Sequence, residues 1–253
     1  MEPTDAEGEH RSIVQRVEAV VSHPVHALSN LEHGVVPAWR SRTRGEPRWV
    51  VSIAVACAIG MQIALPAKLA LPPKSLLPIL GIGLLVGLLA VNPRRLDKRS
   101  RTIRAMSVGL TIVLSLANAA SAGRLVFGVV HGHLGTEPVS LLLSGGAIWL
   151  TNVIVFSLWF WELDRGGPAD RAHGLRDYPD FVFPQMTSPE FAPPDWEPEY
   201  LDYFYLSFTN AAAFSPTDVL PAVRWAKMTM MLQAMVSLVT VALVIARAVN
   251  ILQ

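Results

Sequence analysis

The chain has 253 residues, of which 51% are hydrophobic and 16% are charged, and its mean hydropathy is +0.38. A chain this apolar, with so few charges, is typical of a protein whose surroundings are mostly lipid. The formal net charge of +1, with the basic residues gathered in short stretches, excludes a basic nucleic-acid-binding face. We therefore expect an all-α integral membrane protein, with the lipid bilayer as its first partner and no nucleic acid.

Residues 1–48 are polar and form the first predicted region, a cytoplasmic amino-terminal region. Within residues 10–36, apolar side chains recur at helical spacing with charged side chains opposite them. This pattern favours a helix on the inner membrane surface, and a frayed cytosolic tail is the alternative. Cys57 is the one cysteine and lies in an apolar run, which excludes an intramolecular disulfide and a thiolate metal site.

Four to five segments are long and apolar enough to cross about 30 Å of hydrocarbon, which takes about 20 helical residues. We place them at residues 49–65, 76–91, 103–130, 141–161 and 223–251. The first four make a predicted transmembrane region over residues 49–161. The last forms an inner-type helix over residues 223–253. The sequence thus predicts a polytopic protein of about five transmembrane helices.

The third segment is less apolar than the others, because it carries Asn118 and Arg124. A charge at membrane depth costs at least a few kcal/mol. We therefore expect Arg124 to face other helices, a watery cavity or a partner acid, or to extend its side chain to the surface.

The placement of arginine and lysine predicts the orientation. Four arginines lie within residues 40–48, and six basic residues lie within 94–104. Both stretches are expected to be cytoplasmic, which puts the amino terminus inside. Residues 162–222 then lie on the same side if residues 103–130 span the membrane, and on the opposite side if those residues are a re-entrant element.

Residues 162–199 are rich in acids and prolines, which predicts a loop. Aromatic residues within it argue against complete disorder, because such side chains usually dock on something. Two interpretations remain open. One is a solvated linker, and the other is an acidic vestibule that raises the cation concentration beside an entrance.

Residues 200–222 predict a re-entrant helix and loop. Residues 200–214 are typical of a short aromatic helix, too short to span, and a polar turn and a full apolar helix follow it. This order permits irregular backbone at membrane depth, because the freed carbonyls face water or ions rather than lipid. The negative end of the half-helix favours cations in the turn.

The stretch YFYLSFTNAAAFSPTDVLP, residues 203–221, resembles the pore loop of the potassium-channel superfamily, whose pattern is YFSFTTLTTVGYGDxxP before an inner helix. Ser207, Phe208 and Thr209 match the pore helix, Asp218 the acid after the filter, and Pro221 the later proline. The resemblance implies a pore helix with the polar residues Asp202, Ser207, Thr209 and Asn210. It also implies a filter-like loop of Ala213, Phe214, Ser215, Pro216, Thr217 and Asp218.

A second resemblance covers about the last 170 residues. The basic loop before residue 103, the motif WFWELDRG at 159–166, the pore-like loop and LVTVALVIARAVNIL at 238–252 resemble the bacterial membrane-protein family of unknown function called DUF1345. This resemblance implies a multi-pass protein of the bacterial inner membrane, and it implies no particular activity.

The filter-like loop departs from the potassium-channel pattern, because both filter glycines are absent. Glycine permits the backbone dihedrals that aim successive carbonyls at the ion, whereas Pro216 fixes φ and removes an amide hydrogen. The hydroxyls of Ser215 and Thr217, with the carboxylate of Asp218, instead predict a wider ring. We expect weak selectivity for monovalent cations, and no cofactor or resident metal.

Three function classes follow from these patterns. A channel requires a closed homo-oligomer, for which the resemblance implies a homotetramer, because one loop supplies only part of an axial ring. The alternatives are a non-conducting scaffold or assembly protein, and a small-solute or proton-coupled transporter that uses Asn118, Arg124, Asp202 and Asp218 at mid-depth. We do not expect an enzyme, because no catalytic or phosphate-binding motif is present.

Overall fold

The computed structural model describes residues 37–91, 96, 100–132, 137–213 and 218–252. Within them the fold is mostly helical, with eight α-helices and one two-stranded sheet. The amphipathic helix predicted within residues 10–36 lies outside the described residues.

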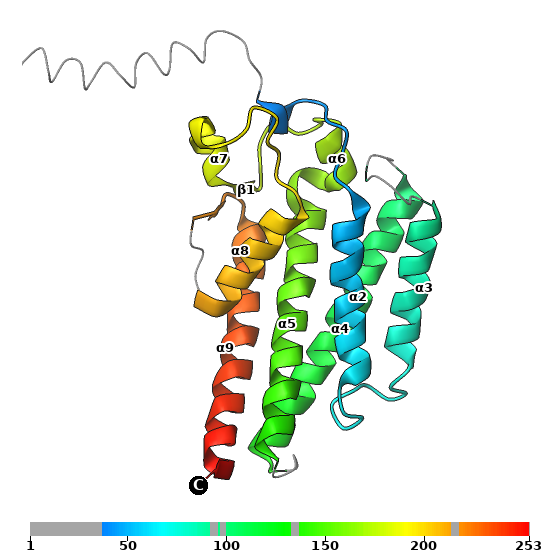
Figure 1. Ribbon diagram of the computed structural model, residues 1–253, viewed down its shortest axis with the longest axis vertical. Helices are drawn as coiled ribbons and strands as arrows, with labels where there is room; N and C mark the ends of the chain where they lie inside the picture. The colour runs from blue at the N-terminus through cyan, green and yellow to red at the C-terminus, as the bar shows by residue number, and fades with distance from the viewer. Residues whose placement is uncertain (1–36, 92–95, 97–99, 133–136, 214–217, 253) are drawn as a thin grey trace, which may run out of the picture. The chain divides into compact units, whose positions relative to one another are not determined.

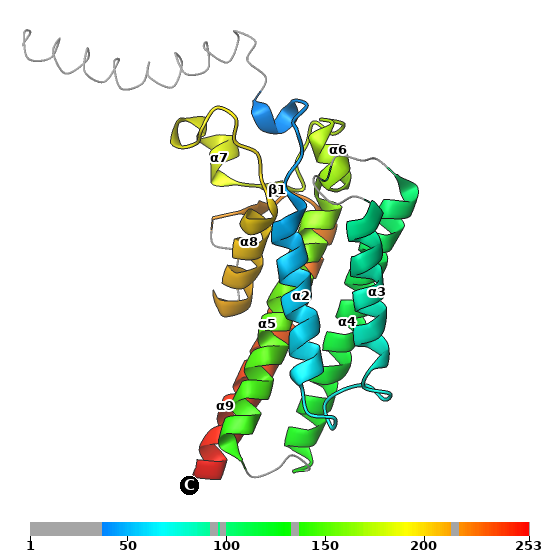
Figure 2. The ribbon, with the colours of Figure 1, turned by 45° about the vertical axis from the view of Figure 1, so that its right-hand side comes forward.

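Five long helices run lengthwise beside one another (Figures 1 and 2). They are α2 (Arg48–Ala64), α3 (Leu76–Val91), α4 (Arg101–Val130), α5 (Pro138–Leu163) and α9 (Arg224–Leu252). By length and composition, α4, α5 and α9 can each cross a membrane, while α2 and α3 are shorter apolar helices of 17 and 16 residues. The predicted fold class is thus confirmed in its coarse form, as a mostly helical chain with three helices able to span a bilayer.

Proline sets several helix boundaries. Leu65, just before Pro66, has extended backbone and ends α2, because a residue that precedes proline avoids the helical region. Pro138 begins α5 in the first turn, where its missing amide hydrogen leaves no bond unmade.

Helix α5 lies at the centre of the bundle and packs against α2, α4, α8 and α9. Its contact with α9 is close at Gly145, where an added Cβ would lie 2.6 Å from a methyl carbon of Val244. Small residues permit such close approach between helices in membranes. Large apolar side chains such as Ile79, Leu143 and Met235 are exposed, as expected for a surface solvated by lipid.

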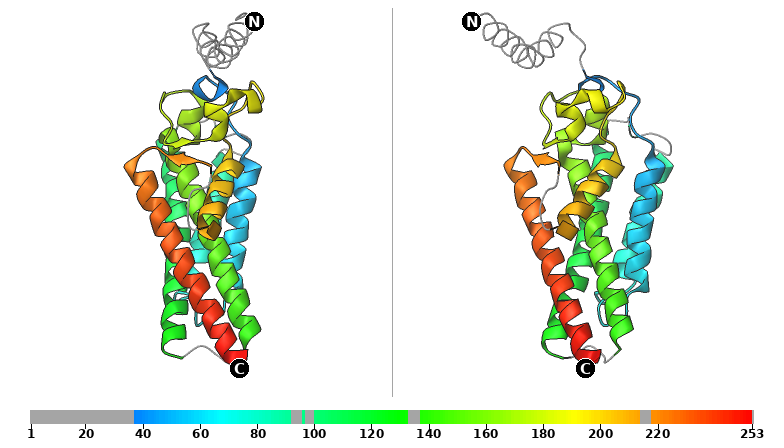
Figure 3. Two further views of the ribbon diagram at one scale, coloured as in Figure 1. Left: turned by 90° about the vertical axis from the view of Figure 1, so that its left-hand side faces the viewer. Right: turned by 60° about the vertical axis from the view of Figure 1, so that its left-hand side comes forward.

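The segment between α5 and α8 folds into a cap at one end of the bundle (Figure 3). It contains η2 (Asp164–Gly166), α6 (Pro168–Ala172), β1 (Phe181–Val182), α7 (Pro184–Thr187) and η3 (Pro189–Phe191). Strand β1 pairs antiparallel with β2 (Leu220–Pro221), with Phe181 opposite Pro221. Phe181 and Phe183 are buried at 0% and 3% exposure, so the interpretation of this segment as a solvated linker is wrong.

Residues 38–47, which include η1 (Ala38–Arg40), belong to the same cap. The guanidinium of Arg165 donates to the Trp39 carbonyl, and the Thr43 amide donates to the Ala172 carbonyl at 2.9 Å. We refer to residues 38–47 and 164–199 together as the cap. Helix α4 is one continuous helix of 30 residues that is long and apolar enough to cross a membrane, which favours a span over a re-entrant element for residues 103–130.

Candidate functional site

The half-helix α8 (Tyr200–Ala213) begins at the cap and ends part-way along α5 and α9 (Figures 1 and 3). Its 14 residues span about 21 Å at about 1.5 Å per residue, less than the roughly 30 Å of a hydrocarbon core. Strand β2, which follows α8 in the chain, pairs with β1 of the cap, and α9 begins just after it. The described elements on both sides of the loop, the start of α8 and β2, therefore lie at the cap end of the bundle.

Three buried polar side chains hold α8 against its neighbours, and we call them the α8 anchor: Ser207, Asn210 and Gln233. Ser207 Oγ donates to the Val153 carbonyl of α5 at 2.6 Å. From α9, Gln233 Nε2 donates to Ser207 Oγ at 2.6 Å and to its carbonyl at 2.9 Å. Asn210 Nδ2 donates to Gln233 Oε1 at 2.8 Å and to the Met230 carbonyl at 3.0 Å. The anchor joins α8 to both long helices.

The predicted pore-helix residues thus serve several purposes. Ser207 and Asn210 point toward α5 and α9, within the chain. Thr209 Oγ1 donates to carbonyls of its own helix, those of Tyr205 at 2.9 Å and Leu206 at 3.0 Å. Asp202 accepts the Glu199 amide hydrogen at 2.8 Å. It lies in the first turn of α8, where a carboxylate interacts favourably with the positive end of the helix dipole. The described contacts of all four side chains are structural.

The filter-like loop is described only at its two ends. Ala213 is the last residue of α8 and is exposed, and Asp218 is exposed just before buried Val219. The other predicted filter residues lie outside the described residues: Phe214, Ser215, Pro216 and Thr217.

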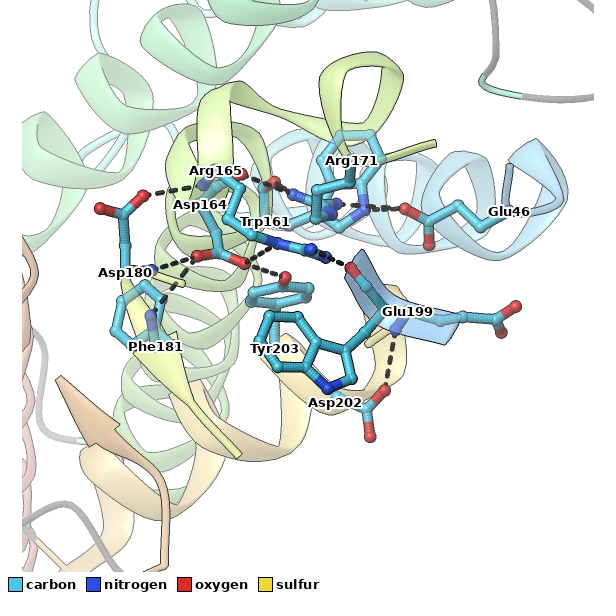
Figure 4. A network of polar contacts seen from close by, with 11 residues as sticks. Glu46, Trp161, Asp164, Arg165, Arg171, Asp180, Phe181, Glu199, Asp202 and Tyr203 are labelled. Carbon is cyan, nitrogen blue, oxygen red and sulfur yellow. Dashed lines mark hydrogen bonds and ion pairs between the residues drawn. The ribbon is translucent and has the colours of Figure 1, made fainter. Parts of the chain in front are cut away.

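The first turn of α8 is bound to the cap by Glu46, whose contact with Arg171 is drawn in Figure 4. Glu46 Oε2 accepts the amide hydrogen of Tyr200 at 2.8 Å. Its Oε1 accepts the indole hydrogen of Trp161 and a guanidinium hydrogen of Arg171, the latter at 3.3 Å. One carboxylate therefore joins the start of α8 to the end of α5 and to α6.

Asp164 makes a second set of contacts to α8 (Figure 4). Its Oδ2 accepts the hydroxyl hydrogen of Tyr203 at 2.6 Å and lies 3.9 Å from Arg165 Nε, while its Oδ1 accepts the Asp180 amide hydrogen at 2.9 Å. Arg171 Nη1 donates to the Asp164 carbonyl at 3.0 Å. We call this group the cap network: Glu46, Asp164, Arg165, Arg171 and Tyr203. Each member is at most 7% exposed, so its charges depend on one another rather than on water.

Burial raises the pKa of Glu46 from 4.5 to about 7, and the nearby Arg171 opposes this rise without cancelling it. The carboxyl group that binds the start of α8 therefore changes its charge close to neutral pH.

This pKa predicts a pH dependence of folding. The folded state holds the Glu46 proton more tightly than the unfolded state does. The stability that this proton contributes is therefore fully present below about pH 4.5 and is lost as the pH rises toward 7. We expect the stability advantage of the wild type over Glu46→Gln to fall across this window, by at most about 1.4 kcal/mol per pH unit. Unfolding of detergent-solubilised protein between pH 4 and 8 measures it, with Glu190→Gln at an exposed acid as control. A difference that stays constant with pH would contradict the assignment.

Asn118 and Arg124 lie apart from α8 on α4. Asn118 is 3% exposed, and its Oδ1 has no hydrogen-bond partner within the described part of the chain. Arg124 Nη1 points toward the Lys68 carbonyl, 3.5 Å away in the α2–α3 connection, at the end of the bundle opposite the cap. Arg124 therefore extends toward the bundle end, which is one of the outcomes expected for it. Its contact with the Lys68 carbonyl is not the pairing with an acid at mid-depth that the transporter alternative requires.

Sequence reasoning missed the residues that position α8, above all Glu46, Asp164, Arg171 and Gln233. Gln233 carried a usable signal, because a long amide within the apolar run MMLQAM needs buried partners. The charged members of the cap network carried no such signal, because the sequence around a buried acid in a proline-rich stretch does not differ from that around a solvated one.

No group of three or more potential metal-ligating side chains lies within the residues that the structure describes. Comparison of the chain with protein-family models, curated proteins and solved structures gives no match.

Proposed function

We propose that this chain is a pore-loop, channel-like membrane protein that conducts monovalent cations with weak selectivity. The observation that carries the proposal is the path of α8, which enters from the cap end, stops part-way along the bundle and is followed by a full-length apolar helix, α9. A half-helix of this kind brings irregular backbone to membrane depth, and that backbone requires water, ions or protein around it.

The proposal includes five spans, with α2 and α3 crossing beside the three longer helices. The cap carries Arg40, Arg42 and Arg44, and Arg48 begins α2, so the positive-inside rule puts the cap in the cytoplasm. The amino terminus is then cytoplasmic, and the pore-like loop enters from the cytoplasmic side. The resemblance to the DUF1345 family supports a bacterial inner membrane as the location.

A complete pore requires several copies of the chain, and we propose a homotetramer. Helix α9 offers two different faces for this. Ser237 and Thr240 are buried within the chain, whereas Met228, Met231 and Met235 are 58–63% exposed. The exposed methionines give a flexible apolar surface against a neighbouring copy or lipid.

The ion path is proposed to pass the loop from Ala213 to Asp218. The carboxyl end of α8 faces this loop with its partial negative charge, and Asp218 adds an exposed carboxylate at the loop's far end. Both features attract cations. Neither provides a series of binding sites that fit one particular ion, so the proposed selectivity is weak.

A non-conducting scaffold is the second candidate. The α8 anchor favours it, because Ser207, Asn210 and Gln233 satisfy one another inside a single chain. Such a helix closes the bundle whether or not ions pass beside it. The transporter alternative lacks a comparable observation.

Ion flux into liposomes that contain the purified protein separates these candidates, with potassium, sodium and chloride compared in turn. Under the proposal, Asp218→Asn lowers cation flux several-fold or changes the permeability ratios, because it removes the charge that concentrates cations. The matched control is Asp195→Asn, which changes an exposed acid of the cap. Equal flux for wild type and Asp218→Asn, at equal amounts of folded protein, would contradict the role of Asp218. A silent wild type would favour the scaffold.

A further inference from the structure

A cavity of about 410 Å³ lies between the amino end of α4, the end of α5 and the turn into α6, and its lining contains no residue of the α8 anchor. Its volume is within the range of small-ligand sites. Seven charged or hydroxyl side chains line it: Arg48, Ser100, Arg101, Arg104, Ser107, Glu162 and Asp170.

Two buried and opposite charges line one part of the cavity. Glu162 is 3% exposed and Arg48 is 6% exposed. Ser107 Oγ donates to Glu162 Oε2 at 2.8 Å, and the Glu162 carboxylate attracts Arg48. Charged side chains are seldom this buried unless they are paired, so this lining is prearranged rather than adaptable surface.

The turn into α6 forms another wall. Arg104 donates to the Gly166 carbonyl, and its Nη1 lies 3.8 Å from Asp170 Oδ2. Gly166 and Gly167 have φ of +86° and +99°, and a Cβ on Gly166 would lie 2.7 Å from Asp170 Oδ2. Glycine is therefore required here, and it holds the backbone close to Arg104.

Among the residues that the structure describes, the charges that line the cavity do not cancel. Asp170 faces Arg104 and Glu162 faces Arg48, while Arg101 is exposed and has no ion pair with any residue that the structure describes. The first turn of α4 contains no acid, and the Ser100 side chain does not cap it. The amide hydrogens of this turn and the Arg101 guanidinium therefore provide a positive field beside the cavity.

We propose that this cavity binds a phosphate group, with Arg101 and the amino end of α4 as its principal partners and Arg104 beside them. Planar guanidinium groups and helix amino ends bind phosphate oxygens by charge-assisted hydrogen bonds. The phosphate comes from a phospholipid headgroup at the membrane surface or from a soluble phosphate ester. Leu96, Ile103 and Trp161 add apolar lining, which suits a lipid.

The test is binding to the full-length protein in an uncharged detergent, measured by native mass spectrometry and by thermal unfolding. The probes are phosphatidylglycerol, a diacylglycerol with the same chains but no phosphate, glycerol 3-phosphate and inorganic phosphate. We expect Arg101→Gln to weaken phosphate binding about tenfold, and Arg101→Lys to restore part of it. The matched control is Arg224→Gln, which changes an exposed arginine outside the cavity.

Saturable binding of phosphatidylglycerol but not of diacylglycerol, lost in Arg101→Gln, supports a lipid source. Saturable binding of the soluble phosphates, lost in the same variant, supports a soluble ester. Because Arg101 is exposed, its variant is expected to fold, and unchanged unfolding without ligand verifies this. Absence of phosphate-dependent binding, or equal binding by Arg101→Gln and Arg224→Gln, would overturn the proposal.

Discussion

Replacing Asp164 by alanine is expected to destabilise the folded protein by about 3–5 kcal/mol, the range for breaking a buried charge pair. The substitution removes the acceptor for the Tyr203 hydroxyl and the Asp180 amide, and it leaves Arg165 buried without the carboxylate 3.9 Å from its Nε. Nε and Nη2 of Arg165 already have no hydrogen-bond partner among the described residues. Chemical unfolding in detergent micelles, followed by tryptophan fluorescence, measures the loss.

The control for this prediction is Asp177→Ala, which removes an exposed acid of the same segment and should change stability by less than about 0.5 kcal/mol. Tyr203→Phe removes only the hydroxyl and is expected to cost an intermediate amount, about 1–3 kcal/mol. Equal stability of Asp164→Ala and Asp177→Ala would show that the cap network does not hold the cap together.

Replacing Gln233 by leucine is expected to cost about 2–4 kcal/mol, since it removes three hydrogen bonds of the α8 anchor. Among the described residues, the Asn210 amide group then keeps only its bond to the Met230 carbonyl. With α8 held less firmly, any flux through the liposomes should fall together with stability. Unfolding and flux measured on the same preparation test both effects.

Gln62→Leu is the matched control, because Gln62 is also buried in an apolar helix but accepts one hydrogen bond, from Ser121 at 3.2 Å. Its Nε2 has no partner within the described residues, so leucine also removes an unpaired donor there. We expect a loss below about 1 kcal/mol. A loss as large as that of Gln233→Leu would mean that α8 is not specifically anchored by the glutamine.

The long helices were predictable from the sequence because prolines and charged residues mark where they begin and end. The predicted segment at residues 76–91 coincides with α3, and the segment predicted at 49–65 is shifted by one residue from α2. The short aromatic helix predicted at 200–214 corresponds to α8. Apolar runs that end at proline or at clusters of charge leave little freedom in where a helix begins and ends.

The cap could not be predicted in the same way. Its contacts join residues far apart in the chain, as Glu46 joins Tyr200, and its strands contain only two residues each. No periodicity marks such pairings, because the contacts are set by tertiary packing. Composition also misleads here, since Asp164 and Arg165 lie in an acidic, proline-rich stretch and yet are 0% and 1% exposed.

Only part of the candidate site could be predicted, because some of its contacts also join residues that are far apart in the chain. The half-helix and its polar turn follow from local sequence, so Ser207 and Asn210 were identified, but the partner of both, Gln233, lies on another helix. The predicted assignment of these two side chains to a pore helix stays a prediction, and their described contacts lie within the chain.

The most direct test of the pore is block of flux at the tip of α8. Ala213 is changed to cysteine after Cys57, which is exposed, has been changed to serine. The protein is reconstituted in liposomes, and a membrane-impermeant cationic thiol reagent is applied from the cap side and, separately, from the other side. The account predicts cation flux that the reagent blocks from the cap side and leaves intact in the Cys57→Ser parent. Folded protein without cation flux, or flux that modification of residue 213 does not change, would contradict it.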